Sequence, residues 1–204
     1  MIRLPRLYAV ADAAFGDPVD LAAALFEGGA RLVQLRNKAA SSQTLLAETE
    51  TILRLAPPGS RVFVNDRTDV ARIAAAAGVH LGQNDLPPHL SRAILSNEQV
   101  IGYSTHDLSQ ALEAELAPVD YIAVGPVFAT TTKADAEVPL GLEKLREICS
   151  RVSKPVVAIG GISLQSAHEV LKCGVTSLAV ISDILKHEDV AERTRQWVEH
   201  LELR

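Results

Sequence analysis

The stretch VFVNDRTDVARIAAAAGVHLGQND, residues 62–85, contains one complete structural unit of this chain. It opens with a short apolar run, Val62 to Asn65, and continues through a helix-like segment, Val70 to Ala77, that closes at Gly78. A second apolar run, Val79 to Leu81, follows. Neither run alternates with polar residues, which is typical of parallel strands whose two faces are both covered. The stretch therefore predicts a strand, a helix and a second, parallel strand.

The same unit recurs along the whole chain. Eight short apolar runs predict strands over Leu7–Ala11, Leu32–Arg36, Val62–Asn65, Val79–Leu81, Val100–Ser104, Tyr121–Gly125, Pro155–Gly160 and Leu178–Ser182. Eight units in 204 residues leave about 25 residues for each, which is short but sufficient for a (β/α)8 barrel. An open doubly wound sheet is the alternative, but such sheets usually have five or six strands. We therefore expect an α/β fold with a single TIM-barrel domain over residues 1–204.

Capping residues mark several of the helices. Asp17 before Pro18 is typical of a helix start, and Asp107 with Gln110 three residues later resembles a capping box. Apolar stripes and terminal glycines predict further helices over Leu45–Leu53, Ser163–Gly174 and Val190–Leu201.

The composition excludes several classes of protein. Twenty basic and 25 acidic residues give a net charge of −5, aromatic residues make up 4%, and 48% of residues are hydrophobic. These values argue against a disordered chain and against a nucleic-acid partner. No apolar run reaches the roughly 18 residues of a membrane span, and the opening residues do not resemble a secretory signal. With only two cysteines, Cys149 and Cys173, we expect a cytoplasmic protein without a membrane partner.

Polar residues and glycines gather where the predicted strands end. In a TIM barrel the chemistry lies at the C-terminal ends of the strands. The residues found there are Gln34, Arg36, Lys38, Asn65, Asp66, Asp85, Ser104, Thr130–Lys133, Gly160, Gly161, Ile181 and Ser182. Arg36 and Lys38 are the residue types that an anionic substrate needs, although a solvated strand exit would also suit them.

Asp66 and Asp85 form the most informative pair. Taken singly, Asp66 could cap the next helix and Asp85, just before two prolines, could belong to a turn. Together, two carboxylates on adjacent strand ends can share Mg²⁺, which prefers oxygen ligands and bridges phosphates. Neither has the Cys/His neighbours that would suggest zinc.

Two anion sites follow from these positions: one formed by Arg36, Lys38, Asn65 and Lys133 with a possible Mg²⁺ on Asp66 and Asp85, and one formed by the last loops of the barrel. The hydroxyls of Thr130–Thr132 followed by Lys133 suit an oxyanion, although the loop could also be plain surface. Gly160 and Gly161 could form an ordinary turn, but the loops after strands seven and eight of TIM barrels commonly bind phosphate. We therefore expect substrates that carry phosphate and pyrophosphate groups.

The motifs in their order along the chain resemble those of the thiamine phosphate synthase family. They are QLRNK, VNDRTDVA, GVHLGQND, IGYSTH, DYIAVGPVFATTTK, PVVAIGGI and LAVIS, and they extend over nearly the whole chain. The resemblance implies a (β/α)8 barrel. It also implies an Mg²⁺-dependent transferase that joins hydroxymethylpyrimidine diphosphate to hydroxyethylthiazole phosphate, giving thiamine phosphate and pyrophosphate through a pyrimidine carbocation.

The resemblance also implies roles for individual residues. Arg36, Lys38, Ser104 and Lys133 would be catalytic, and Asp66 and Asp85 would hold Mg²⁺. The pyrimidine diphosphate would bind to Gln34, Leu35, Arg36, Asn37, Lys38, Asn65, Ser104 and Lys133. The thiazole phosphate would bind to Thr130, Thr131, Thr132, Gly161, Ile181 and Ser182. Asn37 and Asn84 depart from the family pattern, which more often has acidic residues there.

Two other functions remain open from the sequence. The related thiazole tautomerase shares the barrel and would use His106 to carry a proton, but it usually lacks the full basic and metal-binding set. A non-catalytic barrel that binds a phosphorylated ligand is the second. An apolar helix face would also allow a homodimer.

Overall fold

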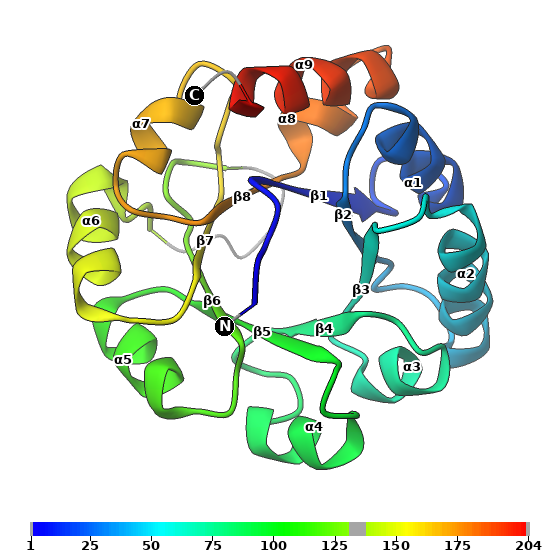
Figure 1. The fold of residues 1–204 in the computed structure, drawn as a ribbon, viewed down its shortest axis with the longest axis horizontal. Helices are drawn as coiled ribbons and strands as arrows, with labels where there is room; N and C mark the ends of the chain where they lie inside the picture. The colour runs from blue at the N-terminus through cyan, green and yellow to red at the C-terminus, as the bar shows by residue number, and fades with distance from the viewer. Residues whose placement is uncertain (1, 131–137, 203–204) are drawn as a thin grey trace.

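A computed structural model describes residues 2–130 and 138–202, which form a closed barrel of eight parallel strands surrounded by helices (Figure 1). The strands are β1 (Leu7–Asp12), β2 (Leu32–Arg36), β3 (Arg61–Asn65), β4 (Gly78–Leu81), β5 (Val100–Thr105), β6 (Tyr121–Val124), β7 (Val156–Ile159) and β8 (Ser177–Val180). They follow one another around the ring in chain order, and β8 pairs with β1. The predicted (β/α)8 barrel is confirmed.

The helices lie outside the ring, where they connect consecutive parallel strands. They are α1 (Pro18–Glu27), α2 (Ser42–Leu55), α3 (Thr68–Ile73), α4 (Pro88–Ile94), α5 (Leu108–Leu116), α6 (Gly141–Arg151), α7 (Ala167–Leu171), α8 (Ser182–Leu185) and α9 (Val190–Glu202). Asp17 caps α1 by accepting from the amides of Val19 and Asp20, and Asp107 caps α5 by accepting from Gln110. None of the described helices has the length and apolar character needed to cross a membrane.

The strands bury side chains on both faces, which explains their continuous apolar sequences. Outward-facing residues such as Leu35 pack against the helices in the larger core. Inward-facing residues form a second core inside the barrel, centred on Tyr8, Phe63 and Tyr121. The three inner rings pack with centroids about 6 Å apart. The barrel interior is therefore filled by side chains, as in other TIM barrels.

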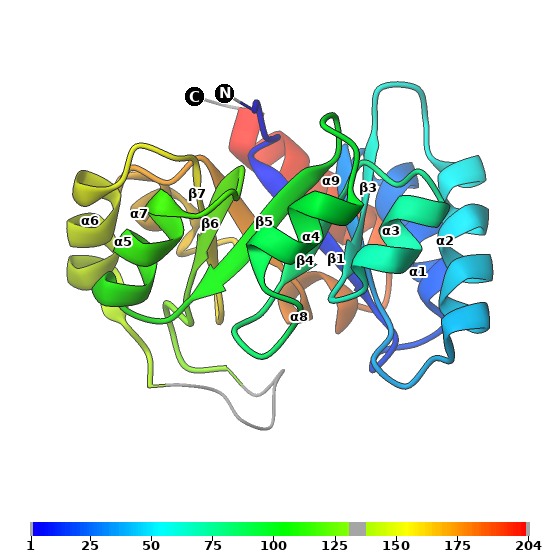
Figure 2. The ribbon, with the colours of Figure 1, turned by 90° about the horizontal axis from the view of Figure 1, so that it is seen from below.

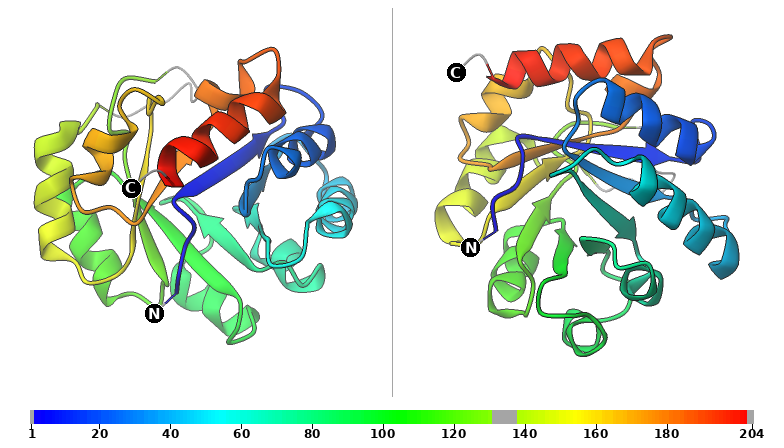
Figure 3. Two further views of the ribbon diagram at one scale, coloured as in Figure 1. Left: turned by 45° about the horizontal axis from the view of Figure 1, so that its top comes forward. Right: turned by 45° about the vertical axis from the view of Figure 1, so that its right-hand side comes forward.

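The last helix completes the ring. Helix α9 packs against α1 and β1 (Figure 3). Its Trp197 is fully buried and donates to the Asp183 carboxylate at 2.7 Å, and Arg193 pairs with the same carboxylate at 2.8 Å. Near the start of the chain, the Arg6 guanidinium donates to the carbonyl of Leu201. Both termini lie at the same end of the barrel (Figure 2).

Two predicted helix boundaries are wrong. The helix expected over Val70–Ala77 ends at Ile73, because Ala75 takes a left-handed φ of +54° and the amide of Ala76 bonds back to the carbonyl of Ala71. Gly78 opens β4 and does not end the helix. The helix expected from Ser163 begins only at Ala167, because residues 163–166 form a turn closed by the serine hydroxyl of Ser166.

Candidate active site

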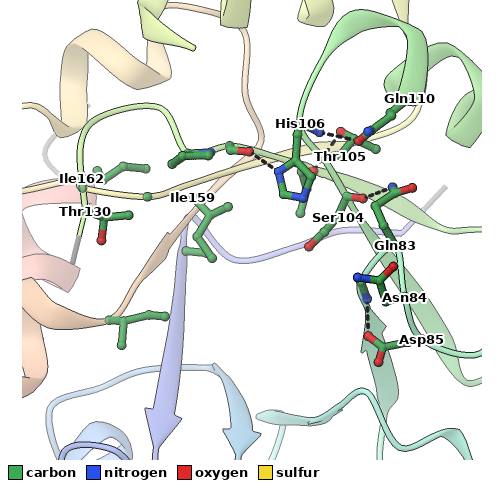
Figure 4. Close-up of a pocket in the computed structure, with 18 of the residues that line it drawn as sticks. Gln83, Asn84, Asp85, Ser104, Thr105, His106, Gln110, Thr130, Ile159 and Ile162 are labelled. Carbon is green, nitrogen blue, oxygen red and sulfur yellow. Dashed lines mark hydrogen bonds between the residues drawn. The ribbon is translucent and has the colours of Figure 1, made fainter. Parts of the chain in front are cut away.

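A cavity of about 500 Å³ opens at the C-terminal ends of the strands, which is a size typical of small-molecule sites. Thr130 and Ile162, from the loops after β6 and β7, lie on one side of it (Figure 4). Asn84 and Asp85, from the loop after β4, lie on the other side, and Ser104 lies between the two sides. The cavity thus has two chemically different ends.

One end holds two carboxylates and a lysine. Asp66 has a left-handed φ of +63°, which is uncommon for a residue other than glycine and often marks a functional position. Its carboxylate lies 3.3 Å from the Lys38 ammonium. Burial, together with a hydrogen bond to Asp66 and the charge of that neighbour, raises the pKa of Asp85 to about 6. The two carboxylates are therefore close enough to compete for a single proton.

The structure also tests the simpler roles of these two residues, a helix cap for Asp66 and a turn for Asp85. Arg67 occupies the N-cap position of α3, so Asp66 does not cap that helix. Asp85 does close a turn, because its Oδ2 accepts from the amide of Gly82 at 2.6 Å. Asp85 therefore closes this turn and also lies beside Asp66.

The carboxylate pair suits a hard divalent cation. Mg²⁺ is usually held by one or two carboxylates and completes its shell with water and phosphate oxygens. Among the described residues, no group of three His, Cys, Asp or Glu side chains is placed to hold a metal, so a cation here would have Asp66 and Asp85 as its acidic ligands. A bound cation would also remove the repulsion that raises the pKa of Asp85.

Arg36 is already paired. Its guanidinium lies 2.6 Å from the Asp12 carboxylate, and Asp12 is 2% exposed. The pair joins the C-terminal ends of β1 and β2, because Asp12 and Arg36 are partners in the strand register. Asp12 was not singled out from the sequence, although it too is a charged residue directly after an apolar run.

The opposite end of the cavity consists of closely packed backbone. Gly160 and Gly161 have φ values of +100° and +64°. A Cβ on Gly160 would lie 2.5 Å from the Cβ of Pro126, so only glycine fits. The loops after β6 and β7 are joined by the amide of Phe128, which donates to the carbonyl of Gly160. Thr130, Gly161, Ile181 and Ser182 line this end, as far as the described residues extend.

The predicted site residues fall into four groups. Lys38, Asp85, Ser104, Thr130, Gly161, Ile181 and Ser182 line the cavity. Gln34, Arg36, Asn65 and Asp66 lie at or near strand ends beside it. Leu35 and Asn37 point elsewhere: Leu35 is buried against the helices, and the Asn37 amide donates to the Glu48 carboxylate on α2. Thr131, Thr132 and Lys133 lie outside the described residues.

Some cavity residues were given no role in the coupling reaction by the sequence. Gln83, Thr105, His106 and Gln110 line the wall between the two ends. His106 Nδ1 lies 2.6 Å from the carbonyl oxygen of Gly125, and the backbone amide of His106 donates to the Gln110 side chain. Gln83, Thr105 and His106 were visible in the sequence as polar residues at predicted strand ends, whereas Gln110 was visible only as part of a helix start.

Comparisons with known proteins agree with this architecture. A family model described as thiamine monophosphate synthase matches residues 7–184. The chain is 40% identical to thiamine-phosphate synthase from Koribacter versatilis, over 98% of this chain and 97% of that protein. It is 43% identical to thiamine-phosphate synthase from Chloroflexus aurantiacus, over 94% and 90% of the two chains.

Solved structures extend the comparison to three dimensions. Thiamine phosphate pyrophosphorylase from Pyrococcus furiosus superposes with a TM-score of 0.89 at 39% identity, covering 97% of this chain and 95% of that chain. The thiamine phosphate pyrophosphorylase of Bacteroides thetaiotaomicron gives a TM-score of 0.70 at 19% identity, over 100% and 99% of the two chains. At that identity the second likeness shows the fold alone.

Proposed function

The chain belongs to the thiamine monophosphate synthase family, and on this basis we propose how its residues carry out the coupling reaction of a thiamine-phosphate synthase. The enzyme is a transferase with a phosphorylated pyrimidine and a phosphorylated thiazole as substrates. The reaction proposed is the condensation of 4-amino-2-methyl-5-hydroxymethylpyrimidine diphosphate with hydroxyethylthiazole phosphate, giving thiamine phosphate and pyrophosphate.

The observation that carries this proposal is the two-ended cavity. Its acidic and basic end, with Lys38, Asp66 and Asp85, suits a diphosphate and a divalent cation. Its glycine-rich end, with Gly161 and Ser182, suits a monophosphate that takes hydrogen bonds from backbone amides and a hydroxyl. Two substrates carrying these groups would place their organic parts toward each other, near Ser104.

The reaction needs positioning and charge stabilisation more than a protein nucleophile. The bond between the pyrimidine methylene and the diphosphate oxygen breaks, and its electron pair leaves with pyrophosphate. The thiazole nitrogen then donates its lone pair to the pyrimidine carbocation, forming the C–N bond. Arg36, Lys38 and Lys133 would stabilise the negative charge on the leaving group, with Gln34, Asn65 and Ser104 holding the pyrimidine diphosphate.

The cation proposed is Mg²⁺, held by Asp66 and Asp85. When bound, it would neutralise charge on the diphosphate oxygens and so favour their departure. The remaining binding contacts would come from the protein: Thr130, Thr131, Thr132, Gly161, Ile181 and Ser182 for the thiazole phosphate. The closeness of the two carboxylates is the support for this assignment.

A coupled assay tests the proposal directly. Both substrates are supplied with and without Mg²⁺, and thiamine phosphate and pyrophosphate are measured. We expect equal amounts of the two products, and only with Mg²⁺ present. Isomerisation of the thiazole without a coupled product would overturn the assignment in favour of the tautomerase.

Lys133 offers a sharper test of the leaving-group contacts. We expect Lys133→Ala to lower the coupling rate by about 10²–10³ while leaving thermal stability nearly unchanged. Lys186→Ala is a matched control, because Lys186 is exposed and does not line the cavity. Equal turnover in both variants would remove Lys133 from the pyrophosphate site.

A homodimer and a cytoplasmic location are proposed as well. Exposed Ile73 on α3 and Leu90 and Ile94 on the neighbouring α4 support the first, and sedimentation equilibrium checks it. The unpaired Cys149 and Cys173 support a reducing compartment, which cell fractionation checks.

A further inference from the structure

A buried chain of hydrogen bonds crosses the barrel interior and ends at the cavity. It starts at Gln34 on β2, whose Nε2 lies 2.6 Å from the hydroxyl of Tyr8. The Tyr8 hydroxyl lies 3.0 Å from that of Tyr121, and the Tyr121 hydroxyl lies 2.9 Å from Nδ1 of His80. His80 Nε2 lies 2.8 Å from the Ser104 hydroxyl oxygen, which faces the cavity.

The hydrogen-bond chain depends on the absence of a side chain at Gly102. Tyr121 on β6 reaches His80 on β4 by passing over β5 at Gly102, the register partner of both residues. A Cβ on Gly102 would lie 1.9 Å from the Cζ of Tyr121, so any side chain there would displace the phenol. The Tyr121 ring is also stacked between those of Phe63 and His80, at interplanar angles of 17° and 21°. Its hydroxyl is therefore held in one place.

The chain of hydrogen bonds has a direction, because the Gln34 amide nitrogen at its start can only donate. The amide nitrogen of Gln34 gives a hydrogen to the Tyr8 oxygen, and Tyr8 must then direct its single hydrogen to Tyr121, its other hydrogen-bond partner among the described residues. Tyr121 in turn directs its hydrogen to Nδ1 of His80. Burial raises the pKa of both phenols well above the ordinary value, so both keep these hydrogens.

The tautomer of His80 follows from this direction. An Nδ1 that accepts from Tyr121 leaves the ring hydrogen of the neutral imidazole on Nε2. That hydrogen is donated to the Ser104 oxygen. The Ser104 hydroxyl, with its oxygen engaged as an acceptor, then has its own hydrogen available for the cavity.

We propose that Tyr8 and Tyr121 are positioning residues that hold His80 as the Nε2–H tautomer and so present Ser104 to the ligand as a hydrogen-bond donor. The Ser104 hydrogen is therefore directed to an acceptor atom of the ligand. In the substrates of the proposed function, on which this identification rests, that atom is a pyrimidine ring nitrogen or an oxygen of the diphosphate.

Nuclear magnetic resonance tests the tautomer without any substrate. Long-range ¹H–¹⁵N correlation spectra distinguish protonated from bare ring nitrogens, and the His80 signals are assigned by their loss in His80→Asn. We expect Nε2 protonated and Nδ1 bare in the parent protein. We expect Tyr121→Phe to give a mixture of tautomers, and Tyr103→Phe, which removes a hydroxyl outside the chain, to leave the signals unchanged. Protonation of Nδ1 in the parent protein would overturn the proposal.

A double-mutant cycle tests whether the tyrosines act through Ser104. Binding of magnesium pyrophosphate and of the uncharged hydroxymethylpyrimidine is measured by calorimetry. We expect Tyr121→Phe and Ser104→Ala each to weaken one of these ligands by about tenfold. The double variant should bind no more weakly than Ser104→Ala alone. Tyr8→Phe repeats the cycle one step earlier in the chain, should Tyr121→Phe fail to fold.

The two ligands separate the possible sources of the acceptor atom. Weaker binding of the pyrimidine alone places the acceptor on its ring, and weaker binding of pyrophosphate alone places it on the leaving group. Unchanged binding of both, or losses that simply add in the double variant, would overturn the proposal. A parent protein that shows the Nε2–H tautomer but forms no thiamine phosphate would contradict the proposed function. It would not contradict the hydrogen-bond chain from Gln34 to Ser104.

Discussion

At the scale of single residues, the raised pKa of Asp85 makes the stability of the protein depend on pH. Its pKa of about 6 lies above the ordinary value of 3.8, because burial and Asp66 disfavour its charge. The folded protein thus holds this proton more tightly than the unfolded chain, and its stability falls as the pH rises between about 4 and 6. Above pH 6 the charges of the two carboxylates oppose each other, and the proposed cation would relieve that repulsion.

The first prediction follows from this sign. Asp85→Asn should raise the Tm of the metal-free protein at pH 8 by about 2–4 °C and should have no such effect below pH 4. The same variant should lose the rise in Tm that Mg²⁺ gives the parent protein. Thermal unfolding with and without Mg²⁺ measures both effects. Asp69→Asn is the control, because the Arg67 guanidinium lowers the pKa of Asp69 and its loss should not stabilise the protein. A lower Tm for Asp85→Asn at pH 8 would contradict the prediction.

A second prediction separates two cations that share one proposed task. Arg36→Ala should cost about 3 kcal/mol of unfolding free energy, because it leaves the buried Asp12 carboxylate unpaired. Lys38→Ala should cost less than about 1 kcal/mol, because Lys38 is 60% exposed. Both variants should lower the coupling rate by about 10²–10³. Chemical denaturation and the coupled assay give the two quantities, and equal losses of stability would disprove the distinction.

Sequence reasoning found charged residues more readily than buried polar ones. Lys38, Asp66 and Asp85 stand out because they are charged residues close to the ends of predicted strands. Tyr8 and Tyr121 lie inside apolar runs and were assigned to strands, which is correct but says nothing of their hydroxyls. The other members of their hydrogen-bond chain come from three other strands of a closed ring, so no local pattern could reveal them.

At the scale of elements, the loops after β6 and β7 act as one unit. Gly160 lies where these loops touch. Its φ of +100° strains any residue with a side chain, and a Cβ there would also clash with Pro126. Gly59 has a similar φ of +82° but nothing within 4 Å of an added Cβ. Comparing substitutions at the two glycines therefore distinguishes the cost of backbone strain from the cost of a steric clash.

The third prediction compares these glycines. Gly59→Ala should cost about 1–2 kcal/mol of unfolding free energy, from backbone strain alone. Gly160→Ala should cost a further 1–3 kcal/mol or so from overpacking, and should raise the KM for the thiazole substrate. Urea unfolding and steady-state kinetics measure these changes. Equal costs for the two variants would show that the loops can separate without penalty.

Strands were easier to predict than helices. All eight apolar runs became strands, with ends shifted by a residue or two, because burial on both faces leaves a continuous apolar signature. Helices α4, α6 and α8 lack a side-chain hydrogen bond at the N-cap, so no capping signal marked their starts. Helix α3 ends on Ala75 in the left-handed region, where a glycine would have been the recognisable signal.

At the scale of the molecule, closure of the ring depends on α9. Its Trp197 fills space beside β1 and donates to Asp183, which follows directly on Ser182 of the cavity. The last helix thus supports both the joint between the first and last strands and one wall of the site. The count of eight units predicted a barrel, but it could not show which residues close it.

The fourth prediction concerns this closure. Trp197→Phe should lower the free energy of unfolding by about 2 kcal/mol, because it leaves a small cavity and removes one donor to the half-buried Asp183 carboxylate. Glu199→Gln, an exposed change on the same helix, should alter it by less than about 0.5 kcal/mol. The midpoint of urea unfolding reports both. A midpoint for Trp197→Phe that matches the parent would show that α9 is not needed to hold the ring closed.

The position of the chain ends has a practical consequence. Both lie at the end of the barrel where Arg6 meets Leu201, remote from the loops that form the cavity. An affinity tag, a fluorescent label or a fused enzyme attached at either end would leave the mouth open to solution. The protein should therefore keep its full turnover when immobilised on a bead or joined to the enzyme that supplies one of its substrates.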